Sequence, residues 1–380
     1  LQVDGLAASP ELGPRVRQTA GTQFRQFHQV QPTSKSYNVH LYTMGFEKTF
    51  LEDMASIEVR VPFARTIDSN LNLVSGSFLF DVPDATPLVK PTPGRTLGDA
   101  DTELQDTSVI LKAIISQDPC GQWVVSAGLG VTIPTGEDLN ATVVDYSNDV
   151  PGDPGDAVFF RPNNQFAFDQ RVRQFEIENS TWGISPFLAA AMTPSKRTFI
   201  NGFAQVDCPI NSSDWSFREI DRDLQILFNP NVVGANPNAP PSVQSIQFDR
   251  TLSGTIRDQY LLHLDIGGGY WFYRNPSKRH LRGVAGLMEL HYTGTLNEAD
   301  IVTVRETPIR TLDANGLVGP LAPPRLGNIA NHLNILNFTL GSTVVVGKHA
   351  AISTAYVAPL RDGMDRTFDG ELNVQLNWYR

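Results

Sequence analysis

The chain has 380 residues, 41% of them hydrophobic and 18% charged, and its 30 basic and 40 acidic side chains give a net charge of −10. No basic cluster alternates with aromatic residues as a nucleic-acid surface requires, so nucleic acid is excluded as an expected partner. No apolar run reaches the roughly 18 residues of a membrane-spanning helix, which excludes a helical membrane protein. A transmembrane β-strand needs only about 9 to 11 residues, so that class stays open.

The N-terminal residues, Leu1 to Pro14, contain neither the basic nor the apolar segment of an export signal. We therefore expect an exported chain whose signal has already been removed. Residues 1–16 are interpreted as an N-terminal extension and residues 17–380 as a single domain.

Val, Ile, Thr and aromatic residues recur at every second position in segments bounded by turn residues, which is the period of a β-strand. The clearest segments are 57–63, 107–115, 123–133, 262–266 and 368–379. In the last one, Phe368, Leu372, Val374, Leu376 and Trp378 share one face, and Asp369, Glu371, Asn373, Gln375 and Asn377 share the other. The pattern predicts an all-β, antiparallel fold whose strands have one apolar and one polar face.

The connections between these strands alternate in length. Short turns are expected at 52–54, 117–121, 193–196, 275–279 and 347–348, and long loops at 67–102, 135–179, 211–256 and 298–329. This asymmetry is typical of an up-and-down transmembrane barrel with short periplasmic turns and long extracellular loops. The pattern gives eleven strands, and because single-chain bacterial barrels have an even number, we expect a twelfth within Gln18 to Val30.

The segment Ser126-Ala-Gly-Leu-Gly-Val-Thr-Ile-Pro134-Thr-Gly136 resembles the MetA-pathway of phenol degradation family of outer-membrane barrels. Leu111 to Ala113, Trp123 and the segment Ile184-Ser-Pro-Phe-Leu188 extend the resemblance to about the middle third of the chain. It implies a barrel related to fatty-acid-transporter-type channels, in the bacterial outer membrane. The phenol in the family's name does not identify a substrate.

Motifs of enzymes and cofactor sites are missing in their proper context, so we expect neither catalysis nor a cofactor. The glycine cluster Gly267 to Gly269 lies inside a strand pattern. We interpret it as a bulge or kink that lets the sheet curve, rather than as a phosphate-binding loop.

Charged side chains on the polar faces are candidates for lining the lumen of the barrel. Those expected to line it or to form a constriction are Glu47, Glu58, Arg60, Lys112, His263, Asp265, Glu289, His291, Glu371 and Asn373. His263, Asp265, Glu289 and His291 lie on two strands joined by a short turn, close enough for cross-strand hydrogen bonds or for a divalent metal. The expected arrangement is a hydrogen-bonded network, with a metal site as the alternative.

Aromatic residues near the predicted strand ends suit the girdles that anchor a barrel at both membrane interfaces. We assign Trp123, Trp182, Trp271, Trp378 and Tyr379 to these girdles. Cys120 and Cys208 are expected at opposite ends of the barrel, too far apart for a disulfide.

The function predicted from the sequence is passive passage of small solutes through an outer-membrane, porin-like channel, with residues 159–170 as a candidate plug. The expected partners are outer-membrane lipid, small solutes, the barrel-assembly machinery and other envelope proteins. The main alternative is a structural or surface-interaction barrel with a plugged lumen. A barrel enzyme and a soluble secreted β-sandwich are further alternatives.

Overall fold

The computed structural model describes residues 18–30, 37–65, 70–76, 95–97, 102–148, 168–227, 242–303, 311–312, 318–319, 325–326 and 331–379. Nearly all regular structure in these residues is β-strand, and the remaining element is the 3-10 turn Gly363–Asp365. No helix within these ranges has the length and apolar character needed to cross a membrane. The expectation of an all-β, antiparallel fold is confirmed, with one exception among the described strand pairs: residues 70–76 and 140–146 pair in parallel.

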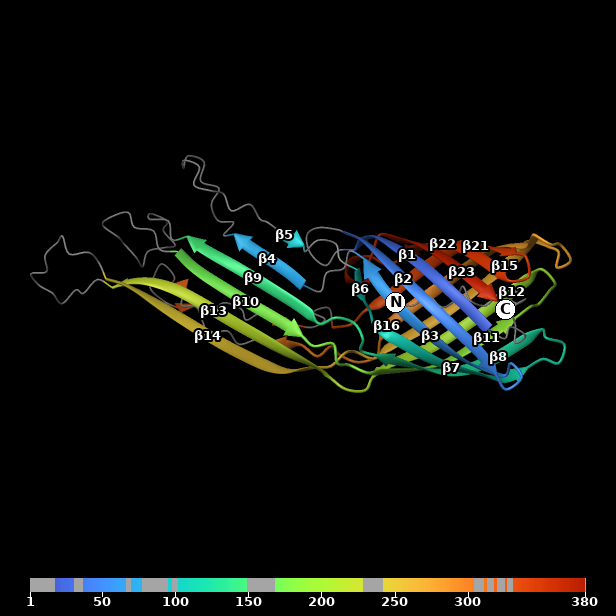
Figure 1. Cartoon of the computed structure of the whole chain (residues 1–380), viewed down its shortest axis with the longest axis horizontal. Coiled ribbons are helices and arrows are strands. Elements are labelled where there is room, and N and C mark those ends of the chain that lie inside the picture. Colours follow the sequence, from blue (N-terminus) through green and yellow to red (C-terminus); the bar gives the residue numbers. More distant parts are fainter. Residues whose placement is uncertain are drawn as a thin grey trace, which may run out of the picture.

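The larger of the two main sheets holds thirteen strands among the described residues. One of them, β6 (Thr102–Leu104), pairs with β3 alone. The other twelve are β1 (Gln18–Val30), β2 (Tyr37–Phe50), β3 (Ala55–Arg65), β7 (Thr107–Gln117), β8 (Trp123–Ile133), β11 (Gly183–Met192), β12 (Thr198–Pro209), β15 (Leu261–Arg274), β16 (Leu281–Thr295), β21 (Asn334–Val346), β22 (Ala350–Pro359) and β23 (Gly370–Tyr379). Each pairs with its neighbours in antiparallel register, and the sheet curls around an axis along the length of the molecule (Figure 1).

The ends of this series of strands are also paired. Strand β1 lies between β2 and β23, with Thr19 opposite Tyr379 and Gln18 opposite Lys48. Strand β2 also pairs with β3, so β1 and β2 are connected to the remaining strands on both sides. Strand β1 is the twelfth strand expected from the even-number rule, and it occupies the residues predicted for it.

Short connections occur at the five places that the sequence predicts. They join β2 to β3, β7 to β8, β11 to β12, β15 to β16, and β21 to β22. In the first, Leu51, Glu52 and Asp53 all have positive φ values, and in the last Gly347 has φ 60°. All five turns lie at one end of the sheet, which we call the short-turn end (Figure 1).

The long connections contain a second sheet, which the sequence analysis did not predict. Its six strands are β4 (Asn70–Gly76), β5 (Arg95–Leu97), β9 (Leu139–Asn148), β10 (Phe168–Ile177), β13 (Ser213–Leu227) and β14 (Ser242–Ile256), and it extends beyond the end opposite the short turns (Figure 1). The pairs β17 (Val302–Thr303) with β20 (Arg325–Leu326) and β18 (Thr311–Leu312) with β19 (Val318–Gly319) are minor. Residues 159–167 of the candidate plug lie outside the described residues, and Phe168 to Gln170 begin β10.

An aromatic core stabilises the second sheet. Trp215 and Phe217, two positions apart on β13, are buried, and Phe175, Ile177, Leu252, Ile256 and Val302 pack against them. On the same sheet Arg218 donates two hydrogen bonds to Asp249, at 2.6 and 3.0 Å. These bonds lower the pKa of the Asp249 carboxyl. The interpretation of 211–256 as a long loop was therefore wrong, because the segment contains β13 and β14, and Trp215 and Phe217 already show the period of a strand.

The glycine cluster of β15 does not form a bulge. Gly267, Gly268 and Gly269 continue the ladder in register with both β12 and β16, and the irregularity lies further along, between Trp271 and Tyr273. The space above the glycines is taken by neighbouring side chains: a Cβ on Gly267 would lie 2.7 Å from Cγ of Glu289. A Cβ on Gly269 would overlap the ring of Phe199 and the carbonyl oxygen of Gly286. The cluster therefore accommodates bulky side chains on the inner face.

Replacing Gly269 by valine is expected to destabilise the protein by about 3 kcal/mol, the upper part of the usual range for overpacking. The Phe199 ring could rotate away, but the backbone oxygen of Gly286 cannot move without breaking the ladder. Denaturant unfolding would measure the difference. The matched control is Gly202→Val in the neighbouring strand β12, where a Cβ would meet only the carbonyl oxygen of Asp265, at 3.8 Å. Equal losses at both sites would contradict the packing explanation.

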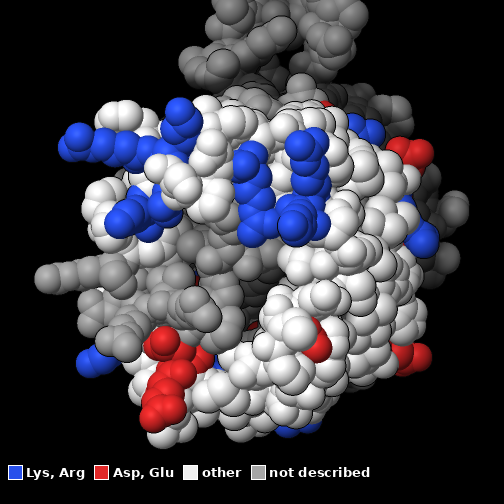
Figure 2. Space-filling model, turned by 90° about the vertical axis from the view of Figure 1, so that its right-hand side faces the viewer, with Lys and Arg blue, Asp and Glu red and all other residues white. Residues whose placement is uncertain are grey.

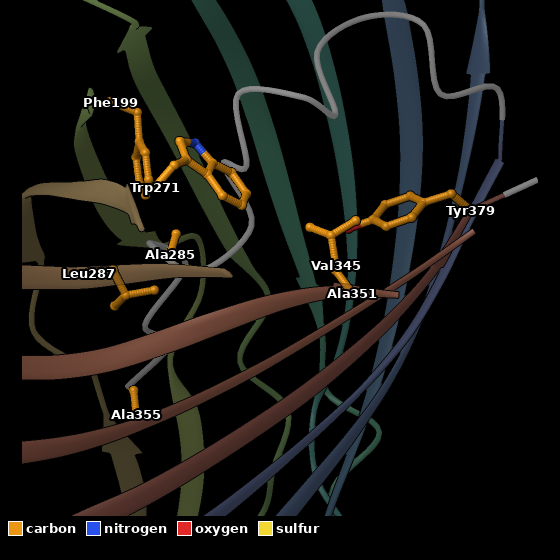
Figure 3. Close-up of a cluster of buried hydrophobic side chains, with 8 residues drawn as sticks. All are labelled: Phe199, Trp271, Ala285, Leu287, Val345, Ala351, Ala355 and Tyr379. Carbon is orange, nitrogen blue, oxygen red and sulfur yellow. The ribbon is translucent and has the colours of Figure 1, made fainter. Parts of the chain in front are cut away.

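An apolar cluster occupies part of the inner face towards the short-turn end (Figure 3). It consists of Phe199, Trp271, Ala285, Leu287, Val345, Ala351, Ala355 and Tyr379. Trp271 is 2% exposed and its ring centroid lies 6.0 Å from that of Phe199. The assignment of Trp271 and Tyr379 to an outer girdle was therefore wrong, because both side chains point inward.

Candidate lumen site

The two faces of the larger sheet have the reverse of the usual polarity of a protein in water. The inner face buries polar side chains, including Glu289, His291, Thr293, Asn337, Thr339, Thr343, Ser353, Glu371, Asn373 and Asn377. The outer face exposes large apolar ones, including Met44, Phe46, Ile57, Leu111, Ile115, Leu188, Ile266, Phe272, Met288, Leu340, Tyr356 and Trp378. Exposed apolar surface on this scale marks contact with a nonaqueous phase or with another protein.

Three of the predicted girdle residues do lie on the outer face. Trp123 is 42% exposed, Trp182 45% and Trp378 56%. Trp123 begins β8 and Trp378 stands one residue before the end of β23, so both are at the short-turn end. Trp182 precedes β11 and is at the opposite end. The outer face therefore carries exposed tryptophans near both ends of the strands.

Four of the predicted lumen residues form one ion-pair cluster on β2, β3 and β7. The Nε of Arg60 lies 2.5 Å from Glu58, and the ammonium of Lys112 pairs with Glu58 and lies 3.3 Å from Glu47. The hydroxyl of Ser56 donates a hydrogen bond of 2.6 Å to Glu47. The cluster combines two cations with two carboxylates, so it is close to neutral overall.

The histidines belong to a second cluster, which spans β12, β15, β16 and β21. Nδ1 of His291 lies 2.8 Å from Asp265, and its Nε2 lies 3.0 Å from the hydroxyl of Thr339 and 3.5 Å from Glu289. Because a carboxylate only accepts, Nδ1 carries the proton, and in a neutral ring Nε2 accepts from Thr339. Asp265 and His291 stand directly opposite each other in the β15–β16 ladder, two residues from the register in which His263 would face His291 and Asp265 would face Glu289.

His263 has different partners from those expected. Its Nε2 lies 2.8 Å from Asp207 of β12, and its Nδ1 lies 3.0 Å from the hydroxyl of Thr293. His263 therefore does not join Glu289 and His291 in one four-residue site. Among the residues that the structure describes, no group of three or more His, Cys, Asp and Glu side chains could hold a metal ion. The structure shows two hydrogen-bonded groups, one around His291 and one around His263, in place of the single network that the sequence predicts.

Glu371 and Asn373, the remaining predicted lumen residues, are both 0% exposed. They lie on β23, opposite Val357 and Ala355 of β22. Further along the same wall, the hydroxyl groups of Thr343 and Ser353 lie 2.8 Å apart. On the β21–β23 side the inner face is therefore packed with polar side chains rather than open.

Asp207 and Thr339, each of which contacts a histidine, were not predicted from the sequence. The alternation of polar residues at Gln205 and Asp207 in β12 would have placed Asp207 on the inner face. Thr339 has no comparable signal, because threonine is common on either face of a strand. As expected, Cys120 and Cys208 are both free.

Neither a protein-family model nor a curated protein sequence matches the chain. Several solved structures resemble it. An outer membrane channel from Pseudomonas putida F1 has 7% identity and a TM-score of 0.49, with 96% of each chain covered. The CymD monoaromatic hydrocarbon channel has 9% identity and a TM-score of 0.36 over 98% of this chain and 91% of its own. The Pseudomonas putida toluene transporter TodX has 8% identity and a TM-score of 0.36 over 96% and 89%.

The first of these neighbours is an outer membrane channel, the second a hydrocarbon channel and the third a toluene transporter, and likeness at this level assigns neither a family nor a substrate. The resemblance to the MetA-pathway family stays a resemblance. What the chain does has to be inferred from its own residues.

Proposed function

We propose that this chain is a closed, twelve-stranded β-barrel of the bacterial outer membrane that lets small solutes pass passively. Residues 17–380 would form the barrel domain, with the short turns in the periplasm and the second sheet outside the cell. The observation that carries the proposal is the polarity of the wall: apolar side chains point out and hydrogen-bonded polar side chains point in. Hydrocarbon on the outside and water inside is the environment that this pattern suits.

The two lumen clusters give such a passage an electrostatic asymmetry. Strands β3 and β16 are six positions apart in the ring of twelve, so the clusters lie on opposite walls. The cluster on β2, β3 and β7 is nearly neutral, whereas the histidine cluster contributes the carboxylates of Asp207, Asp265 and Glu289. A passage between them favours cations over anions, because charged side chains lining a pore select by sign.

The alternative function, a structural or surface-interaction barrel with an occluded lumen, is favoured by one specific observation. Glu371 and Asn373 are fully buried, and the apolar cluster around Trp271 covers the inner face nearer the short turns. An apolar constriction can exclude water and stop ion flow without any solid plug. The two functions therefore differ in whether water and ions can pass this cluster.

Single-channel recording in planar bilayers tests the proposal. We expect discrete, cation-preferring current steps from the purified protein after a heat-modifiability gel has shown that it is folded. Removing the constriction with Trp271→Ala is expected to increase the conductance, because that ring points inward. Trp378→Ala is the matched control, since its side chain points outward near the same end, and the conductance should not change.

The possible results separate the functions. If neither the folded wild-type protein nor the Trp271 variant carries current, the channel function is overturned and the structural barrel is supported. Current from the Trp271 variant alone would place the occlusion at the apolar cluster, and passive passage by the natural chain would be wrong. Protein that stays in aqueous buffer without detergent would contradict the membrane assignment itself.

The expected partners are outer-membrane lipid, small solutes and, during biogenesis, the barrel-assembly machinery. Other envelope proteins are further candidates, and no enzymatic step is required.

A further inference from the structure

Three neighbouring hairpins carry an uninterrupted set of positive charges at the short-turn end. The β11–β12, β15–β16 and β21–β22 turns follow one another around the sheet. We call their cations the basic arc, which consists of Lys196, Arg197, Arg274, Lys278, Arg279 and Lys348. Residues 193–197, 274–280 and 347–349 contain no Asp or Glu, whereas the other two short turns contain Glu52, Asp53 and Asp118.

Figure 2 views the molecule from this end. Lys and Arg side chains gather along one part of the rim, and Asp and Glu side chains gather along another. All six residues of the basic arc are exposed. The short-turn end therefore has a positive and a negative side.

Hydrogen bonds to backbone carbonyl groups join the three hairpins of the basic arc. The amide of Trp271 donates to the carbonyl of Arg197 at 2.7 Å, and the guanidinium of Arg274 donates to the carbonyl of Lys196 at 2.8 Å. The amide of Gly347 donates to the carbonyl of His280 at 2.6 Å. These links join the turns to each other, so the cations belong to one surface rather than to three independent loops.

Most of these cations lack an acidic partner. Within the described ranges, Lys196, Arg197, Lys278, Arg279 and Lys348 form no ion pair with a carboxylate. Like charges held on one surface without counter-charges repel one another and attract an anionic partner. The basic arc is therefore a surface that negative charge would stabilise.

The position of Arg197 indicates where that negative charge lies. Its guanidinium donates a 3.3 Å hydrogen bond to the hydroxyl of Tyr270. The ring of Tyr270 makes an edge-to-face contact with the ring of Phe272, with 5.6 Å between the ring centroids. Tyr270 is 43% and Phe272 67% exposed on the outer wall. A belt of exposed aromatic rings marks the depth of the interface in a membrane protein, and cations just beyond it are at the depth of the phosphates.

We propose that the basic arc binds the anionic headgroups of phospholipids in the leaflet at the short-turn end. This inference rests on the proposed membrane location, and goes beyond it by assigning a lipid class to one sector of the rim. Strands β12, β15, β16 and β21 would be surrounded preferentially by anionic lipid. The sector with Glu52, Asp53 and Asp118 would have no such preference.

The test measures the association of spin-labelled phosphatidylglycerol relative to spin-labelled phosphatidylcholine with the full chain reconstituted in phosphatidylcholine vesicles. We expect a two- to fivefold preference for phosphatidylglycerol at low salt, falling towards one at high salt because the contacts are exposed to solvent. The variant Lys278→Gln/Arg279→Gln should reduce the preference about twofold. The matched control, Arg257→Gln/Arg361→Gln, removes two exposed cations that follow β14 and β22 at the opposite end, and should keep it.

Each outcome decides one question. Equal loss in the two variants, or no preference in correctly inserted wild-type protein, would overturn the proposal and leave the barrel intact. The proposal would also be overturned if the wild-type protein in detergent bound an acidic soluble protein while its preference for phosphatidylglycerol over phosphatidylcholine stayed at one. That result would favour a protein partner. Failure to insert into any vesicle would contradict the membrane location and not the basic arc.

Discussion

Replacing Met288 by arginine is expected to destabilise the protein in a bilayer by about 2 to 4 kcal/mol, the cost of a cation near the middle of the hydrocarbon on the outer face of a barrel. Met288 is 58% exposed and lies in the middle of β16. In a protein surrounded by water, a cation at such an exposed site would change stability by no more than about 0.5 kcal/mol. The sign and size of the effect therefore report which solvent surrounds the wall.

Reversible urea unfolding in phospholipid vesicles would measure the cost. Leu360→Arg is the matched control, because Leu360 is 54% exposed and follows the last residue of β22, where we expect a loss of at most about 1 kcal/mol near the interface. If Met288→Arg costs no more than this control, the outer wall is not in lipid.

Replacing Asp265 by leucine is expected to cost about 3 kcal/mol, because the substitution leaves the buried ring of His291 without an acceptor for its Nδ1–H. The side chains of Asp265 and His291 are 9% and 7% exposed. Asp207 and His263 form a pair with the same 2.8 Å separation, but their side chains are 35% and 12% exposed. Asp207→Leu should therefore cost only about 1 kcal/mol, since water can replace the lost carboxylate.

A double variant separates loss of the pair from general disruption. Asp265→Leu/His291→Leu removes both polar partners, and replacing a buried pair by apolar side chains is often nearly neutral. We expect it to recover most of the stability that Asp265→Leu loses in the same urea titration. A double variant as unstable as the single one would show that Thr339 and Glu289 depend on His291, and the pairwise explanation would be wrong.

The candidate site shows where sequence reasoning succeeds and where it stops. Alternation placed Glu58, Lys112, Asp265 and His291 on inner faces, because successive side chains of a strand point to opposite sides. The short turn between β15 and β16 also brought these residues together to within about two positions, because a tight turn limits the possible registers. The exact pairing of Asp265 with His291 came from the structure. Contacts across a long connection could not be predicted in this way, and for that reason Asp207 was missed as the partner of His263.

The aromatic residues show a second limit. Four aromatic residues follow one another from Tyr270 to Tyr273, so the pattern of apolar and polar positions does not indicate which rings point inward. The irregularity between Trp271 and Tyr273 changes the pairing at that point. Tyr379 is different: it is two residues from Asn377, so its inward direction could be read from the sequence and was overlooked in favour of its position at a strand end.

The sequence by itself determined the strands of the larger sheet, the five short turns and the polar and apolar rows, because these follow from a two-residue period and from local turn chemistry. Only the tertiary structure decided that β1 pairs with both β2 and β23, that a second sheet forms within the long connections, and that β3 and β16, which carry the two polar clusters, lie six positions apart in the larger sheet. Those features depend on which distant segments meet. A local pattern specifies the face that a side chain occupies, but it cannot specify the strand that lies beside it or the ring that lies across from it.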